Sequence, residues 1–582
     1  MAVYNGTSAA NTLTGGLAKV NDSLNGGLGN DLYTWTLGAG SDVITDTGGS
    51  DTVQLGDPNN LFTQWETYRS GNSLIFDFGT AGKLTITNQY LAANTVEKLA
   101  FSDGWGPFYF SASLTGTTAN NLLVGTSAAN TMRGNAGNDL MFGYLGNDSI
   151  YGDTGDDEIH AGAGNDSIYG GAGSDDLFGS AGADRIDGGA DDDTASYLDQ
   201  TQGVIVNFSG VSKTIGGVTL ANGTVYEKAG ATQDALIAIE NVEGSRYGDV
   251  FFGGRTDLPN GGPTFVGGAG NDTIYGGGGN TWMGSSHWDT QSGIIVNLSN
   301  ASIVVGGVTV GSLTARDGLG GIDKYVLSSG QISITGSEFN DYIKGRGDIS
   351  NGWLSGGKGN DTIVGGSGNN DTVGFFSDSE QGVIVNLSTA SITVNSVTVA
   401  ANRARDDFGN TDTLSSIEAV GGSGKHDYIL GSSANNLYLS GRDGNDTING
   451  AAGNDNIYGD NGNDVLTGGA GRDYLSGGAG NDIFDFNGAG ELGFGVAADQ
   501  IDSFVRGQDK IDLSTIDANV GLTGNQAFSF VSSFSGSNAT GQVKYVGGVI
   551  SISTDANSAA EYEIQLVGTL PSTALTAADF IL

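Results

Sequence analysis

Cysteine is absent from the 582 residues, so disulfide bonds, thiolate metal sites and cysteine-based catalysis are excluded. Only three histidines occur, His160, His287 and His426, and no two of them are four residues apart, so the HExxH zinc motif of metalloproteases is missing. The sequence also lacks a GxSxG nucleophile elbow, a Walker loop and long helical patterns. Because no catalytic constellation is visible, we expect that the chain is not an enzyme.

Positive charge is scarce as well. The chain has 65 acidic and 23 basic residues, a formal net charge of −42, which disfavours nucleic acid and anionic membranes as partners and favours cations. No apolar run is long enough for a membrane-spanning helix, so membrane insertion is not expected. The 24 Phe and 20 Tyr argue against disorder. The 102 Gly and five Pro follow no three-residue period, which excludes collagen.

What the sequence does contain is a nine-residue repeat. Seven units run without a gap from residue 134 to 196, and five more from 441 to 485. The sixth position of every unit is Asp, the eighth is nearly always a large apolar residue, and glycines fill the turn before the Asp. Isolated copies, GGAGNDTIY and GGKGNDTIV, lie between the two blocks. A solvated acidic surface needs no fixed period, so the period indicates a structural cause.

This repeat resembles GGxGxDxUx, the calcium-binding nonapeptide of RTX (haemolysin-type) proteins. Glycines allow the tight turns that present backbone carbonyls, and Asp adds a hard anionic oxygen; calcium takes six to eight such oxygens. The resemblance implies a parallel β-roll with two units per turn, in which Asp139 shares an ion with Asp157, and Asp148 with Asp166. The alternative is a β-solenoid whose Asp residues only cap turns. The predicted calcium ligands are Asp139, Asp148, Asp157, Asp166, Asp175, Asp184, Asp193, Asp272, Asp361, Asp446, Asp455, Asp464, Asp473 and Asp482.

A longer repeat, with a period of about 90 residues, occupies residues 196–440. GVIVNFS, GIIVNLS and GVIVNLS each start a unit, and each unit contains alternating β-branched segments typical of strands. We expect solenoid turns interrupted by decorating hairpins. No distinctive polar cluster is visible in these units, so their expected role is to add length and surface.

The two ends of the chain differ. Residues 1–115 read as a divergent relative of the repeat, and the start resembles no Sec signal peptide. Asp31, Asp42 and Asp51 lie there at irregular spacing, so turn capping is expected of them, with calcium binding as the alternative. Residues 441–582 resemble the C-terminal domain of serralysin-type proteases, including the terminal sequence Asp579-Phe580-Ile581-Leu582. That resemblance implies export by a type I machinery with an uncleaved C-terminal signal. The last four residues are expected to serve export and to contribute little to the fold.

These observations predict an all-β protein with calcium-loaded β-roll blocks and decorating hairpin units. The expected domains are 1–115, a divergent β domain; 116–195, a β-roll; 196–440, three tandem β units; and 441–582, a second β-roll with the secretion domain. The expected function is a secreted, calcium-dependent structural protein at the bacterial cell surface, in a surface layer, filament or matrix. Its partners would be calcium, copies of itself, the type I machinery and, as a further candidate, surface polysaccharide. The alternatives are an adhesin and an RTX enzyme or toxin with an unrecognised active site.

Overall fold

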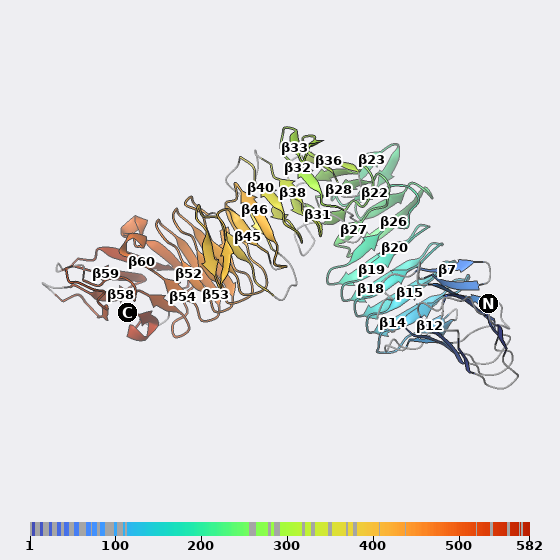
Figure 1. Ribbon diagram of the computed structural model, residues 1–582, viewed down its shortest axis with the longest axis horizontal. Helices are drawn as coiled ribbons and strands as arrows, with labels where there is room; N and C mark the ends of the chain where they lie inside the picture. The colour runs from blue at the N-terminus through green and yellow to red at the C-terminus, as the bar shows by residue number, and fades with distance from the viewer. Residues whose placement is uncertain are drawn as a thin grey trace. The chain divides into compact units, whose positions relative to one another are not determined.

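The computed structural model of the chain is built from β-strands (Figure 1). It describes residues 113–254, 263–276, 281–284, 292–316, 321–327, 332–346, 352–367, 371–375, 381–406, 408–436, 438–519, 521–535, 539–555, 559–569, 571 and 574–582, and the strands of the first 112 residues. Within these residues the only helices are short 3₁₀ turns, and none could cross a membrane. The all-β class and the parallel β-roll predicted from the sequence are confirmed.

The chain forms two compact units, residues 1–252 with 258–268, and residues 253–257 with 269–582. In the first unit, the seven-repeat block folds as a two-sheet roll. One sheet contains β14 (Thr131–Ala136), β16 (Ser149–Thr154), β18 (Ser167–Ala172) and β20 (Arg185–Ala190). The other contains β13 (Leu122–Val124), β15 (Leu140–Phe142), β17 (Glu158–His160), β19 (Asp176–Phe178) and β21 (Thr194–Ser196).

The register of the roll places each residue beside the one two repeats later. Ile150 pairs with Ile168, and Ile168 with Ile186, in parallel. The apolar eighth position of each repeat points between the sheets, and Ile150, Ile159 and Leu177 are fully buried. A three-residue strand cannot be stable alone, but stacking converts these short segments into one continuous core.

The N-terminal strands form a second, smaller pair of sheets in the same unit. β1 (Val3–Asn5), β3 (Ser23–Asn25) and β5 (Gly40–Thr45) stack in parallel in one sheet, and β2 (Thr12–Thr14), β4 (Leu32–Thr36) and β6 (Thr52–Gly56) in the other. Val3 pairs with Ser23 and Thr12 with Leu32, so a turn takes 20 residues here. Asp42 lies inside β5 and is buried, so the expected turn capping is wrong for it, and Asp31 and Asp51 lie outside the described residues.

Each unit of the long repeat interrupts the roll with an antiparallel excursion. In the first, β22 (Val204–Asn207) pairs with β25 (Thr224–Glu227), and β25 pairs with β26 (Thr232–Ile237). β26 then returns to the roll beside β20, while β22 continues in parallel to β28 (Val250–Phe252). The excursion carries a hairpin of its own, β23 (Lys213–Ile215) and β24 (Val218–Leu220). The predicted decorating hairpins are therefore present; we call residues 203–249, 293–341 and 382–427 the modules.

The second unit repeats this topology twice. Strands β32 (Ile295–Asn297), β35 (Thr314–Arg316) and β36 (Ile322–Leu327) correspond to β22, β25 and β26, as do β42 (Ile384–Asn386), β45 (Arg403–Arg405) and β46 (Thr411–Ser415). The hairpins are β33 (Ile303–Val305) with β34 (Val308–Val310), and β43 (Ile392–Val394) with β44 (Val397–Val399).

A buried asparagine organises every module. The side-chain amide of Asn207 donates hydrogen bonds to the carbonyls of Val211, Leu220 and Ala221, at 2.9, 3.1 and 2.9 Å. Asn297 and Asn386 make the same three bonds in their modules, and all three asparagines are fully buried. The expectation that the modules contain no distinctive polar cluster is therefore wrong, because this asparagine holds the base of each hairpin closed.

The second roll comprises β50 (Thr447–Asn449), β51 (Asn456–Asn461), β52 (Val465–Thr467), β53 (Tyr474–Ala479) and β54 (Ile483–Asp485). It continues into β55 (Asp499–Asp502), β56 (Lys510–Asp512), β58 (Gln542–Val546), β59 (Val549–Ser553) and β60 (Tyr562–Val567). The chain's last strand, β61 (Phe580–Ile581), pairs with β56.

The end of the chain is packed into this unit. Phe580 is buried and its ring centroid lies 5.2 Å from that of Phe530. Asp579 is 2% exposed and accepts hydrogen bonds from Thr576 and Arg506. The expectation that the last four residues contribute little to the fold is therefore wrong for Asp579 and Phe580.

Candidate metal sites

The aspartates of the nonapeptide blocks form two ladders, one along each edge of the roll. One carboxylate oxygen, Oδ1, accepts a hydrogen bond from the backbone N–H of the Asp 18 residues earlier: Asp157 from Asp139 at 2.7 Å, and Asp175 from Asp157 at 2.8 Å. The second block repeats the pattern, for example Asp464 from Asp446 at 2.8 Å. A backbone hydrogen bond therefore holds the Oδ1 oxygen of each of these carboxylates in place.

The other oxygen, Oδ2, is buried and has no hydrogen-bond partner at most of the predicted ligands. This holds for Asp139, Asp148, Asp157, Asp166, Asp175, Asp184, Asp193, Asp361, Asp446, Asp455, Asp464, Asp473 and Asp482. A buried carboxylate oxygen without a partner is costly, and repetition at thirteen positions indicates a missing partner of one kind.

Backbone atoms of the loop and of the next turn lie close to this Oδ2 oxygen. In loop Gly152–Asp157, a Cβ added to Gly152 would collide with Oδ2 of Asp157 and would lie 2.6 Å from the carbonyl oxygen of Gly170 on the next turn. A carboxylate oxygen and a carbonyl oxygen therefore converge beside Gly152, where a Cβ would leave no room for them. Positive φ at the second and fourth loop positions shapes the turn: in the loop that starts at Gly134, Asn135 has φ 78° and Gly137 φ 100°.

These oxygens fit a calcium ion. The donors are hard carboxylate and carbonyl oxygens, which calcium prefers, and the loops supply them from two successive turns. Among the described residues no three His, Cys, Asp or Glu side chains gather around one point, so the backbone would provide a large share of the ligands. Calcium supplies a divalent charge that neutralises the buried carboxylates when bound.

The raised pKa values of the aspartates in the ion-free loops agree with a site for a cation. Burial raises the pKa of Asp139 from 3.8 to about 7, with Asp157 adding to the effect. Burial likewise raises the pKa of Asp184 to about 8, with repulsion from Asp234. The ion-free protein therefore holds these side chains in a site that disfavours their charged form.

Other loops at corresponding places are closed. In Gly336–Asp341, the backbone N–H of Ser337 donates to Oδ2 of Asp341 at 2.5 Å, and its hydroxyl donates to Oδ1 at 2.8 Å. The loops ending at Asp249 and Asp427 are closed in the same way. In the loops ending at Asn121, Asn130 and Asn436, an asparagine oxygen takes the backbone N–H. We call these six the closed loops and those with an unpartnered Oδ2 the open loops.

Of the isolated predicted ligands, Asp361 lies in an open loop, and Asp272 lies in a loop with the same positions of positive φ. Asp361 is buried behind Gly357 and Gly359, whose φ angles are 78° and 116°. Asp272 is buried behind Gly268 and Gly270, with φ angles of 74° and 136°. The sequence reading missed Asp499, which continues the ladder by accepting from Asp473 N–H at 2.8 Å and has an unpartnered Oδ2. No spacing signal identifies it, because 26 residues separate the two.

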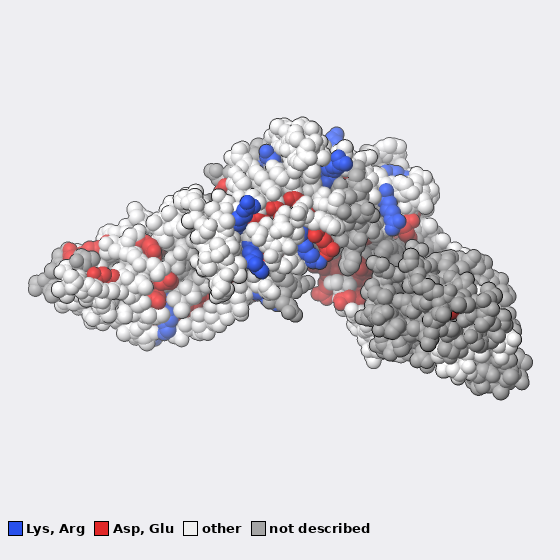
Figure 2. Space-filling model, in the orientation of Figure 1, with Lys and Arg blue, Asp and Glu red and all other residues white. Residues whose placement is uncertain are grey.

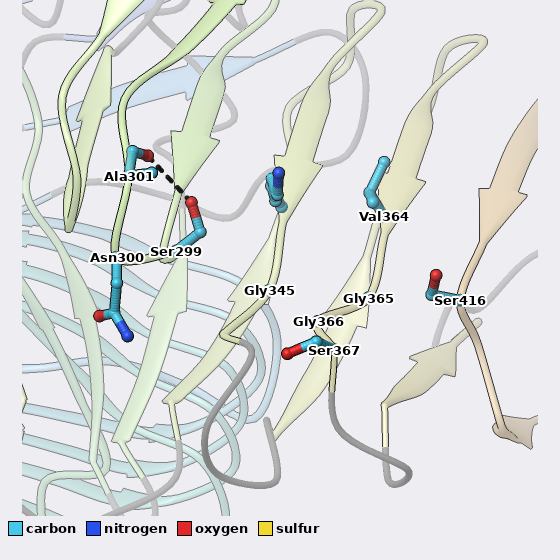
Figure 3. A pocket seen from close by; sticks show the side chains of 10 residues that line it. Ser299, Asn300, Ala301, Gly345, Val364, Gly365, Gly366, Ser367 and Ser416 are labelled. Carbon is cyan, nitrogen blue, oxygen red and sulfur yellow. Dashed lines mark hydrogen bonds between the residues drawn. The ribbon is translucent and has the colours of Figure 1, made fainter.

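The described surface also has a groove of about 570 Å³ in the second unit (Figure 3). Its lining comes from the second module, the third module and the roll segment between them, and is mostly backbone and small side chains, such as Ser299, Gly365 and Ser416. Ser299 is occupied by its hydrogen bond to the carbonyl of Ala301, at 3.0 Å. Lys344 is the single charged residue of this lining, so the groove brings no acid–base pair together.

Comparison with known proteins agrees with the repeat chemistry. The model of the RTX calcium-binding nonapeptide repeat (4 copies) matches residues 36–60, 115–150, 142–177, 151–186, 169–196, 264–280, 346–374, 421–457, 438–466 and 458–488. The chain therefore carries RTX calcium-binding repeats, as predicted, and binds several calcium ions. A comparison with curated proteins gave no match.

Two solved structures are similar in part. One is the AlgE6R3 subunit of the Azotobacter vinelandii mannuronan C5-epimerase, with 30% identity over 27% of this chain and 78% of that chain, and a TM-score of 0.17. The other is the extracellular lipase LipA of Serratia marcescens, with 16% identity over 40% of this chain and 37% of that chain, and a TM-score of 0.15.

Proposed function

Because the chain carries RTX calcium-binding repeats, we propose that it is a secreted structural protein that assembles with copies of itself at the bacterial cell surface when calcium is bound. In this proposal calcium folds the two rolls, and the rolls then hold the modules in place. The observation that supports assembly most directly is the repeated hairpin of the modules.

Each hairpin is a two-stranded sheet separate from the roll sheets. Such a sheet has an open edge on both strands, and open edges favour pairing with another chain. The three hairpins share one register: Thr214 pairs with Thr219, Val304 with Thr309 and Thr393 with Thr398. Val304 is 69% exposed at the first of these positions. Three similar edges on one chain allow several weak contacts to act together.

Charge also favours contact between different parts of two copies. Residues 196–440 contain 12 of the 23 Lys and Arg residues beside 23 acidic residues, whereas residues 116–195 contain 14 acidic and two basic residues. In Figure 2 the basic side chains gather over the modules, which Figure 1 draws in green to yellow. Single Lys and Arg side chains on the modules of one copy can therefore pair with carboxylates on the rolls of another.

The test is assembly of the purified full chain in about millimolar calcium, the range of extracellular calcium sites, followed by light scattering and electron microscopy. Ordered sheets or filaments are expected in calcium and dispersed protein in chelator. A chain that folds in calcium and stays monomeric at every concentration would refute the proposal.

A matched pair of variants tests the hairpins themselves. Thr214→Lys, Val304→Lys and Thr393→Lys together place a charge on all three hairpins and should abolish assembly, because lysine blocks edge pairing. The control puts three lysines at exposed positions outside the modules, Val496, Leu522 and Val546, which are 93%, 59% and 61% exposed. Loss of assembly in both variants would show general charge repulsion instead.

A further inference from the structure

The strands of the first roll continue beyond its last nonapeptide repeat. The chain leaves at β21, makes the first module, and returns at β27 (Asn241–Glu243), which pairs in parallel with β21. The backbone N–H of Asn241 donates to the carbonyl of Asp193 at 2.9 Å, as that of Thr194 does to Asp175 at 2.8 Å. The returning turn, residues 237–240, therefore occupies the place of a next loop above Gly188–Asp193.

Glu240 continues the ladder in this turn. Its Oε2 accepts from the backbone N–H of Asp193 at 3.1 Å, just as Oδ1 of Asp193 accepts from that of Asp175 at 3.0 Å. Asp193 and Glu240 are 0% and 6% exposed. Asp193 therefore does not lie at the end of the stack.

The returning turn also supplies the carbonyl that an open loop needs. A Cβ on Gly188 would collide with Oδ2 of Asp193 and with the carbonyl oxygen of Ala238. Within the roll, a Cβ on Gly170 meets the equivalent pair, Oδ2 of Asp175 and the carbonyl oxygen of Gly188. Ala238 has φ 46°, a conformation that non-glycine residues rarely adopt. Oδ2 of Asp193 is buried with no hydrogen-bond partner.

We infer that Asp193, Glu240 and the Ala238 carbonyl bind a further divalent cation, in a site whose second carboxylate comes from the module and not from a nonapeptide. The donors are hard oxygens, and two buried carboxylates call for a divalent charge, so calcium is the expected ion. The repulsion that Glu240 and Asp191 exert on Asp193 is relieved when the ion binds. The ion would join the first module to the roll, so that calcium holds the returning turn, residues 237–240, against the roll.

The third module offers an internal contrast. Asp371 and Glu418 form the same ladder contact, from Asp371 N–H to Glu418 Oε2 at 3.2 Å. There, however, the backbone N–H of Gly366 donates to Oδ2 of Asp371 at 2.6 Å. The oxygen that is unpartnered at Asp193 is already occupied at Asp371, so Glu418 should not hold an ion.

The experiment counts calcium ions on the full chain by native mass spectrometry. Glu240→Gln keeps the size of the side chain and an acceptor for the Asp193 N–H but removes the charge. It should bind one calcium fewer than the unchanged protein. Glu418→Gln is the matched control and should keep the full number.

Two outcomes overturn the inference: an unchanged ion number in Glu240→Gln, or an equal loss in Glu418→Gln. Thermal melting gives a second reading that does not depend on counting. If no ion binds at this site, Glu240→Gln only removes the repulsion between Glu240 and Asp193, and the melting temperature in calcium should rise. If the ion binds, Glu240→Gln removes one of its ligands, and the melting temperature in calcium should fall. Glu240→Asp, which keeps the charge, should retain the ion with weaker affinity, and its loss of the ion would also contradict the site.

Discussion

The open loops of the two nonapeptide blocks, except Ala161–Asp166, and the six closed loops all begin with glycine, and each loop ends with Asp or Asn. They differ in what satisfies the second oxygen of that side chain. At Asp341 the backbone N–H of Ser337 does so, while the Ser337 hydroxyl donates to the first oxygen; at Asp157 no group of the described protein satisfies the second oxygen. The comparison shows that the backbone conformation of the second loop residue decides whether a turn is complete by itself or needs an ion.

The physical basis is the direction of one peptide N–H. In closed loops the second residue, Ser or Thr, has no positive φ and its N–H points at the carboxylate or amide oxygen. In open loops the second residue has positive φ, as at Asn135 and Ser180, with φ 78° and 70°. Closed loops can therefore hold the modules together without calcium, whereas open loops cannot hold the rolls.

Removal of calcium should have the largest effect and should separate the two kinds of region. If calcium is millimolar and the dissociation constant about 10⁻⁴ M, each ion contributes about 1.4 kcal/mol. Roughly ten ions would then equal the whole stability of an ordinary domain, about 5–15 kcal/mol. In chelator, hydrogen exchange should become fast in residues 134–196 and 441–485. Equal protection with and without calcium would contradict the role of the open loops.

The pH dependence in chelator should have the opposite sign to that in calcium. Burial raises the pKa of Asp139 and Asp184 from 3.8 to about 7 and about 8, so the ion-free rolls are most stable below the unfolded pKa. That stability is lost as pH rises through the folded values. Melting temperatures in chelator should therefore fall from about pH 4 to about pH 8, whereas in calcium they should rise, because the ion requires the deprotonated form. Parallel curves in the two buffers would rule this out.

Removal of the last four residues should have a moderate effect. Losing the buried Phe580 should cost roughly 1.5–3 kcal/mol, and the contacts of Asp579 are lost with it. Denaturant unfolding of Asp579–Leu582 deletion protein in calcium measures this. If the C-terminal signal is the export route, the deletion should also leave the chain inside the cell; full stability and undiminished secretion would contradict both expectations.

Within the rolls, position along the ladder should set the effect of losing one carboxylate. Asp157 lies between open loops on both sides, whereas Asp139 follows the closed loop that ends at Asn121. Asp157→Asn should therefore weaken two ions and Asp139→Asn one, measured by calcium titration of the full chain. Equal losses would contradict the sharing of ions between turns.

The smallest effect on calcium is expected at a closed loop. Asp249→Asn removes charge-assisted hydrogen bonds from Ser245 and Val204 and should cost about 1–3 kcal/mol. The number of bound ions should not change, because both oxygens of Asp249 are already used. A lost ion in this variant would show that closed loops also bind calcium.

Much of the roll follows from the sequence because its interactions are local and periodic. Asp at the sixth position and an apolar residue at the eighth determine which side chains face the loop and which face the core, and the 18-residue register follows from the repeat. For the modules, the sequence predicted hairpins but not their antiparallel topology. Alternating strand patterns do not show that β26 returns to pair with β20 across some 50 residues.

The sequence by itself determined the two rolls, their predicted ligands and the chain's acidic character, because a strict period allows a single stacking register. Tertiary structure alone decided which carboxylates keep an unpartnered oxygen, since Ser180 of an open loop and Ser337 of a closed loop both follow glycine and differ in the direction of the N–H. It also decided that Asp499 and Glu240 join the ladders. Neither Asp499 nor Glu240 lies within a nonapeptide. Both reach the ladder because the chain folds back onto the roll, and a local sequence pattern cannot predict that return.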